Sequence, residues 1–202
     1  PVVDAVQGQR EQGVVYNAPN AHQIRLARLL CERIPSFDLV RFTNSGTEAT
    51  LNTIRAARAV TGKSKIAKVE GGYHGSHDQV SVSVRVNPAK AGERSRPEAL
   101  AATEGLGEGT LDQVVVLPFN ETAMARKILE ENKDQLAAVI IEPILGSVGM
   151  LPAATEFLVM LREFTADNGV ILIFDEVISY RTSMGGAQEY YGITPDMTSL
   201  GK

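Results

Sequence analysis

Asp175 and Lys202 are the two residues in this sequence that could together act on a bound ligand, one as a carboxylate and the other as an amine. Asp175 ends the run GVILIFDEV, Gly169–Val177, in which five apolar residues in succession precede Asp175 and Glu176. This pattern predicts a strand that is buried on both faces and delivers a carboxylate at its carboxyl end. Ligands of open α/β sheets bind at that edge. Because Lys202 follows in PDMTSLGK, we expect a carboxylate and an amine to meet over one ligand.

A second stretch whose residues could bind a ligand is Asn44-Ser45-Gly46-Thr47-Glu48, which follows a predicted short strand at 39–43. Small residues let the backbone approach a ligand closely, and the predicted helix at 47–60 would point its free N–H groups at that ligand. A phosphate would suit the site. The motif alone favours a simpler interpretation, an ordinary helix cap in which Glu48 completes a capping box with Ser45.

Aromatic and imidazole side chains stand in the loop Gly71-Gly72-Tyr73-His74-Gly75, after a predicted strand at 65–69. The ring of Tyr73 could stack on a heteroaromatic ligand, an interaction worth about 0.5 to 1.5 kcal/mol. Its alternative role is to anchor the loop through its hydroxyl group. The spacing of His74 and His77 hints at a metal, but the loop lacks the carboxylates or cysteines that would complete a ligand set, so we predict no metal site.

Glu142 is the third carboxylate expected at this edge. It follows a predicted buried strand at 137–141 and precedes Pro143. Strands alternate with helices along this part of the chain, which is typical of a parallel sheet with crossover helices. Glu142 should therefore lie near Asp175, either in a catalytic network or as a structural carboxylate paired with a basic group.

These residues need a framework, and hydrophobic periodicity predicts an α/β fold with a mostly parallel central sheet. Residues 1–19 are interpreted as an incoming loop, and 87–112 as a long irregular loop. The helix at 22–34 carries an apolar stripe that suits packing on a sheet. Further helices are predicted at 121–132 and 155–168, and further strands at 79–86 and 113–117.

Composition excludes several classes of protein. The 202 residues are 44% hydrophobic and 22% charged, as in globular proteins. A net charge of -4 gives no reason to expect nucleic acid. We find no apolar run long enough to cross a membrane and no signal peptide, so we expect a cytoplasmic protein. A single cysteine, Cys31, excludes an intrachain disulfide.

Five motifs together resemble those of the class III aminotransferases of pyridoxal phosphate fold type I, in particular the glutamate-1-semialdehyde 2,1-aminomutases. The resemblance runs in order from about Tyr16 to Lys202. It implies a three-layer αβα cofactor-binding large domain at 20–202, preceded by the segment 1–19, and a fragment truncated at the lysine that forms a Schiff base. The motifs are NSGTEA (44–49), GGYHG (71–75), EP (142–143), FDEV (174–177) and SLGK (199–202).

The resemblance also implies pyridoxal 5'-phosphate as cofactor and gives roles to particular residues. Lys202 would form an imine with the cofactor aldehyde and then move a proton, and Asp175 would keep the pyridine nitrogen protonated. Val177 would contact the ring face opposite Tyr73. Ser147 stands where the aminomutases carry asparagine, so it would offer a single hydroxyl near the phenolic oxygen. The full set of expected cofactor-binding residues is Ser45, Gly46, Thr47, Tyr73, His74, Glu142, Ser147, Asp175, Val177 and Lys202.

We therefore expect a homodimeric transaminase that moves an amino group between a small amino donor and a carbonyl acceptor. Glutamate-1-semialdehyde aminomutase is the main alternative, because it shares every motif. Decarboxylation or racemisation on the same fold is a further possibility. A different alternative is a catalytically silent fragment that acts as an interaction protein. The loop at 87–112, which in related enzymes helps to select the substrate, departs from the aminomutase pattern.

Overall fold

The apolar runs of the sequence form one parallel sheet. In the computed structural model, which describes all residues 1–202, this sheet has five strands in the spatial order β4-β1-β5-β8-β9, and every neighbouring pair is parallel. The predicted mostly parallel α/β fold is thus confirmed. The strands are β1 (Lys65–Val69), β4 (Val114–Leu117), β5 (Leu136–Ile141), β8 (Ile171–Asp175) and β9 (Met197–Ser199).

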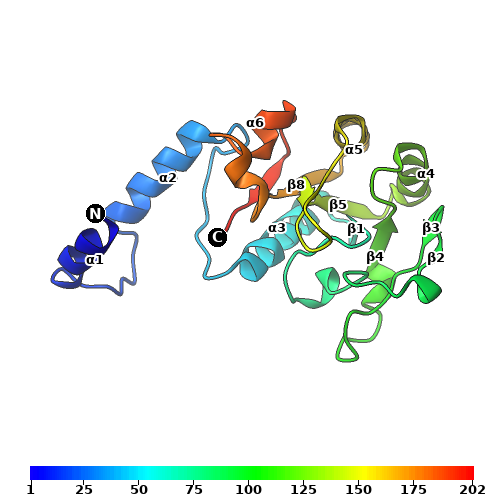
Figure 1. Cartoon of the computed structure of the whole chain (residues 1–202), viewed down its shortest axis with the longest axis horizontal. Helices are drawn as coiled ribbons and strands as arrows, with labels where there is room; N and C mark the ends of the chain where they lie inside the picture. Colours follow the sequence, from blue (N-terminus) through cyan, green and yellow to red (C-terminus); the bar gives the residue numbers. More distant parts are fainter.

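Helices cover both faces of this sheet and make three layers (Figure 1). On one face lies α3 (Gly46–Thr61), whose buried Ile54 and Ala57 join a core cluster with sheet residues such as Ile140. On the other face lie α4 (Thr122–Asn132) and α5 (Thr155–Asn168), which share a larger apolar cluster with β5 and β8. These three of the four predicted helices lie within one residue of their expected bounds.

The order of the strands places a ligand site at one edge of the sheet. From β1 the chain moves outward to β4 at one side, then returns across β1 to β5 and continues to β8 and β9 at the other side. The loops that follow β1, β5 and β8 therefore open at the same carboxyl edge, around the point where the connections change direction. Such a switch point is the usual place for ligand binding in α/β sheets.

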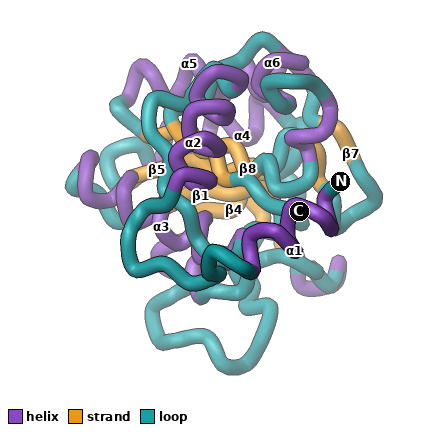
Figure 2. Tube along the Cα trace, turned by 90° about the vertical axis from the view of Figure 1, so that its left-hand side faces the viewer, coloured by secondary structure: helices purple, strands orange, loops and turns teal.

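The N-terminal part differs from the sequence prediction. Residues 1–19 were expected to form a loop, but they contain the helix α1 (Val2–Arg10), which Gly13, with φ +106°, follows. The next helix, α2 (Ala21–Arg33), begins with a capping box of Asn20 and Gln23. Its predicted packing on the sheet is wrong, because α2 has no buried residue. Figures 1 and 2 show both helices projecting from one side of the body, while α3, α4 and α5 cover the sheet.

Two predicted strands are absent. Residues 39–43 form no strand, and 79–86 contain only a single-turn 3-10 helix, Asp78–Val80, and an isolated bridge between Val82 and Ala101. The alternating valines misled the prediction, because Ser83 adopts φ +48° and breaks the extended run.

The remaining elements are short. The expected long loop at 87–112 is largely irregular, and it includes one hairpin, β2 (Gly92–Glu93) and β3 (Arg96–Pro97). A second hairpin joins β6 (Ile144–Leu145) to β7 (Leu151–Pro152). The helix α6 (Ala187–Tyr191) precedes β9, and single-turn 3-10 helices occupy Pro88–Lys90, Leu111–Gln113 and Ser179–Thr182. No helix is both long and apolar enough to span a lipid bilayer.

Candidate active site

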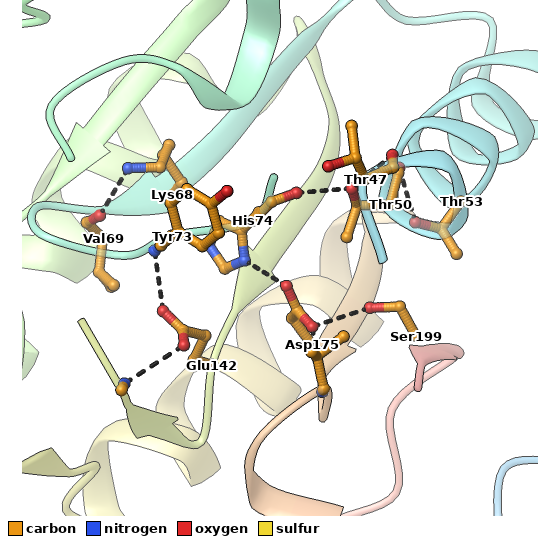
Figure 3. Close-up of polar contacts among 12 residues, drawn as sticks. Thr47, Thr50, Thr53, Lys68, Val69, Tyr73, His74, Glu142, Asp175 and Ser199 are labelled. Atoms are coloured by element: carbon orange, nitrogen blue, oxygen red, sulfur yellow. Dashed lines mark hydrogen bonds and ion pairs between the residues drawn. The ribbon is translucent and has the colours of Figure 1, made fainter. Parts of the chain in front are cut away.

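Asp175 stands at the end of β8 as a buried carboxylate with three donors (Figure 3). Its Oδ2 lies 2.9 Å from His74 Nδ1, and its Oδ1 accepts hydrogen bonds from the Ser199 hydroxyl at 3.1 Å and the Val177 N–H at 3.2 Å. These donors offset the loss of hydration that burial imposes on the carboxylate. An ionised carboxylate has about four acceptor positions, so Asp175 can accept one more donor from the pocket that it faces.

His74 is held through one nitrogen of its ring and through its backbone carbonyl. The side chain is fully buried, and Nε2 has no hydrogen-bond partner. A proton on Nδ1 makes the ring the donor of this hydrogen bond to Asp175. The backbone carbonyl of His74 accepts a 2.6 Å hydrogen bond from the Thr50 hydroxyl of α3. His74 therefore connects the loop after β1 to both β8 and α3, as Figure 3 shows.

The start of α3 combines a cap with free backbone donors. As predicted, the Ser45 hydroxyl caps the helix by accepting the Glu48 N–H at 3.1 Å. The expected capping box is altered, because the Glu48 carboxylate accepts the N–H of Asn44, at 2.9 Å, instead of that of Ser45. The N–H groups of Gly46 and Thr47 have no acceptor within the chain. Together with the positive end of the helix dipole, they form a site suited to an anion.

The loop after β1 approaches this helix start closely. Gly75 has φ +107°, and a Cβ atom placed on it would lie 2.6 Å from Thr47 Oγ1 and 2.8 Å from Thr47 Cα. The N–H of Ser76 also donates to Thr47 Oγ1 at 3.3 Å. Only glycine fits this position, so the conformation of Gly75 controls the distance between the loop and the anion site.

Glu142 positions the aromatic residue of the same loop. It follows β5, is 4% exposed, and accepts hydrogen bonds from the N–H groups of Tyr73 at 2.8 Å and Gly146 at 3.3 Å. Burial raises the pKa of this carboxyl group above its usual value, although nearby His74 and the two backbone donors act in the opposite direction. The ring of Tyr73 is left partly exposed beside the pocket.

Lys68 is a buried amino group that the sequence interpretation missed. It lies within β1, and its Nζ donates to the carbonyl groups of Val82 at 2.8 Å and Val69 at 3.1 Å. Burial lowers the pKa of Lys68 to about 7, and the carboxylates of Glu142 and Glu70 oppose this shift. A lysine inside the apolar strand KIAKV was the available signal.

Asp175, His74 and Glu142 border one pocket of about 210 Å³, which the start of α3 also lines. It brings together nine of the ten residues that the sequence predicts for cofactor binding, including Lys202, which follows β9. The sequence interpretation missed the other three, Gly75, Ile178 and Gly201. The lining residues are Ser45, Gly46, Thr47, Tyr73, His74, Gly75, Glu142, Asp175, Val177, Ile178, Gly201 and Lys202.

Two contacts fix the positions of Val177 and Lys202, which line this pocket. Cβ atoms on Gly46 and Gly201 would lie 3.3 Å and 3.2 Å from the methyl groups of Val177, so the two glycines let the chain close tightly around that side chain. Arg181 donates a 2.6 Å hydrogen bond to the carbonyl oxygen of Lys202. Ser147 is the predicted residue that lies elsewhere, in an adjoining pocket that shares Tyr73 and Gly75 with this one.

The family model described as "Aminotransferase class-III" matches residues 1–202. A glutamate-1-semialdehyde 2,1-aminomutase from Methanococcus maripaludis is 44% identical over 202 residues, which are the whole of this chain and 46% of that protein.

Two solved structures of transaminases superpose on the chain. An omega-transaminase from Sphaerobacter thermophilus superposes with a TM-score of 0.95 at 49% identity, and the match covers 100% of this chain and 46% of that one. A second structure, described as a transaminase with PLP bound, has a TM-score of 0.90 at 38% identity and is matched by 99% of this chain over 45% of its own length. The chain therefore spans somewhat less than half of the proteins that it matches.

Proposed function

Because the chain belongs to the class III aminotransferase family, whose members depend on pyridoxal 5'-phosphate (PLP), we propose that it forms the cofactor pocket of an enzyme that transfers amino groups. The reaction moves an amino group between an amino acid or amine and a carbonyl compound. The observation that carries this proposal is that Asp175, Lys202 and the free N–H groups of α3 border one pocket. PLP needs an anion, an amine and a phosphate site, and this pocket can supply all three.

The residues present suit the cofactor. The unpartnered N–H groups of Gly46 and Thr47 would hold the phosphate, with Ser45 at the helix cap. Val177, enclosed by two glycines, offers an apolar surface for one ring face, and Tyr73 is assigned to the other face. The remaining acceptor position of Asp175 would take the pyridine N–H. When bound, PLP supplies an aldehyde that links to amines and a cationic ring that withdraws electrons from the substrate carbon.

Asp175 and Lys202 are the proposed catalytic residues. Hydrogen bonds from His74, Ser199 and the Val177 N–H hold the Asp175 carboxylate at the edge of the pocket. Lys202 Nζ would hold the cofactor and, as a free amine, would take a proton from the substrate carbon. His74 acts as a positioning residue through Asp175, and Glu142 does so through the backbone of Tyr73.

A second candidate function is supported by the curated relatives. Their name, glutamate-1-semialdehyde 2,1-aminomutase, describes an enzyme that keeps the amino group on one carbon skeleton. The omega-transaminase, at 49% identity, favours transfer between two substrates. Incubation of the whole protein with glutamate-1-semialdehyde alone distinguishes the two, because an aminomutase would form 5-aminolevulinate without any second substrate.

The cofactor anchor is tested by absorbance spectra of the whole protein purified with PLP, beside Lys202→Ala and the surface control Lys127→Ala. We expect visible absorbance that borohydride removes and that depends on Lys202 but not on Lys127. Peptide mapping after reduction should locate the adduct on Lys202. A protein without lysine-linked cofactor at saturating PLP would refute the enzymatic proposal and favour the silent alternative. The homodimer remains a prediction.

A further inference from the structure

A second pocket lies directly beside the proposed cofactor pocket. Its volume is about 430 Å³, and Tyr73 and Gly75 line both pockets. A molecule bound at the proposed cofactor ring could therefore extend past Tyr73 into this space. The eight lining residues are Tyr73, Gly75, Ser76, Ser81, Val84, Arg85, Ala102 and Ser147.

The chemistry of this second pocket suits an anion. Arg85 is the one charged residue among the eight, and Ser76, Ser81 and Ser147 add three hydroxyl groups. None of the ion pairs in the structure involves Arg85, so its guanidinium donors are not taken by another carboxylate of the chain. A planar guanidinium group with adjacent hydroxyl donors matches the two oxygens of a carboxylate.

A strained and well-anchored residue sets the direction of the segment that carries Arg85. Ser83 is 2% exposed and has φ +48°, which is unfavourable for a residue other than glycine. Its backbone N–H donates to Leu100 at 2.7 Å and its carbonyl accepts the Gly71 N–H at 2.8 Å. Its hydroxyl donates to the Glu98 carbonyl at 3.0 Å. Strain of this kind persists where surrounding contacts enforce it, often at ligand sites.

The wall next to Ser83 is equally well fixed. Lys68 Nζ donates to the Val82 carbonyl at 2.8 Å, and Val82 forms a bridge with Ala101. The N–H of Ala102 donates to the carbonyl of Ser81 at 3.0 Å. The segments 81–83 and 100–102 therefore form one hydrogen-bonded wall, and the backbone that leads into Val84 and Arg85 is fixed before any ligand arrives. Such preorganisation lowers the entropic cost of binding.

We propose that this second pocket binds the carboxylate of the substrate, with Arg85 as its cation, and that it selects amino acids and oxo acids over simple amines. The inference rests on the proposed function. A carboxylate held in the second pocket would leave the amino group of the same substrate on the other side of Tyr73, beside the cofactor. It gives the enzyme a substrate class, and it makes Arg85 a specificity-determining residue.

The kinetic test compares the whole protein with Arg85→Gln, Arg85→Lys and the surface control Arg126→Gln. Two donors serve as probes: 3-aminobutanoate and 2-aminopropane, which is the same skeleton without the carboxylate. We expect the ratio of kcat/KM for the acid over the amine to fall roughly 10- to 100-fold in Arg85→Gln, the range of a charge-assisted hydrogen-bond pair. Arg85→Lys should fall between the two, and Arg126→Gln should keep the wild-type ratio.

A binding measurement separates this proposal from the proposed function. Calorimetric titration of butanoate and butanamide needs no turnover and no cofactor chemistry. We expect the protein to prefer butanoate, and Arg85→Gln to lose that preference. Loss of the preference would support the pocket assignment even if no cofactor were linked to lysine. Equal preference in Arg85→Gln and the parent, or an unchanged kinetic ratio with normal cofactor absorbance, would overturn it.

Discussion

Replacement of Gly75 by alanine tests whether the close approach of the β1 loop to α3 builds the phosphate site. A Cβ atom there would lie 2.6 Å from the Thr47 hydroxyl oxygen and 2.8 Å from the Thr47 Cα atom. Rotation of a side chain relieves only the first contact, because the second is with the backbone of the helix. Either the loop or the start of α3 must therefore move, and the N–H groups of Gly46 and Thr47 lie at that start.

The structure also sets the size of the effect. At φ +107° an alanine is strained whatever space surrounds it, and such strain costs about 1 to 3 kcal/mol. Overpacking against a fixed backbone adds a cost of similar size. We expect Gly75→Ala to lower the free energy of unfolding by at least about 2 kcal/mol. A displacement of the anion site should also weaken PLP binding by roughly tenfold, which corresponds to 1.4 kcal/mol.

Gly105→Ala is the matched control, because a Cβ atom at Gly105 meets nothing within 4 Å and its φ is not positive. The assays are urea unfolding without added cofactor and titration of PLP into the protein freed of cofactor. Both should separate the two variants, with Gly105→Ala close to the parent. If Gly75→Ala matched Gly105→Ala in stability and in PLP affinity, the argument that this contact shapes the anion site would be refuted.

Two further predictions concern buried ionisable groups. The variant Asp175→Asn should still bind PLP, but its kcat should be at least about 100-fold lower, because the amide cannot stabilise a charged ring. Steady-state kinetics checks this, with the surface variant Asp112→Asn as control. Lys68 has a folded pKa of about 7, below its unfolded value, so between these values the unfolded chain binds more protons and stability rises with pH from about 7 towards 10.5. The urea midpoint should rise with pH across this range in the parent and in Lys127→Met, and this rise should be absent in Lys68→Met. A parent whose midpoint does not rise would contradict the buried, weakly basic state of Lys68.

Much of the fold could be predicted because local pattern and tertiary environment agree in the sheet and its covering helices. The β1 strand has the predicted bounds, as does α5, which ends at Gly169 with φ +60°. The runs before Glu142 and Asp175 are apolar on both faces, and the structure buries both faces. Strand ends that share one edge then bring Tyr73, Glu142 and Asp175 together, as expected.

The errors arise where a local pattern has no tertiary partner or a competing contact. The apolar stripe of α2 looks like a sheet-packing face, but periodicity does not reveal that other helices cover the sheet. The alternating valines at 79–86 resemble a strand until the left-handed Ser83, fixed by contacts with distant residues, breaks the run. The donor Ser199 was missed because its place beside Asp175 depends on the register of β9 against β8, which spacing alone does not give.

The links that form the pocket also bear on how the chain folds. His74 and Asp175 are 101 residues apart in the sequence, and Ser36 and Thr198, which share a hydrogen bond near the edge strand, are 162 apart. Contacts of such long range impose a large loop-closure entropy, and parallel sheets with many of them fold slowly. We therefore expect the cofactor pocket to assemble late in folding, after the strand order is complete. A ligand that bridges the start of α3 and the segment after β9 would favour this final assembly by mass action.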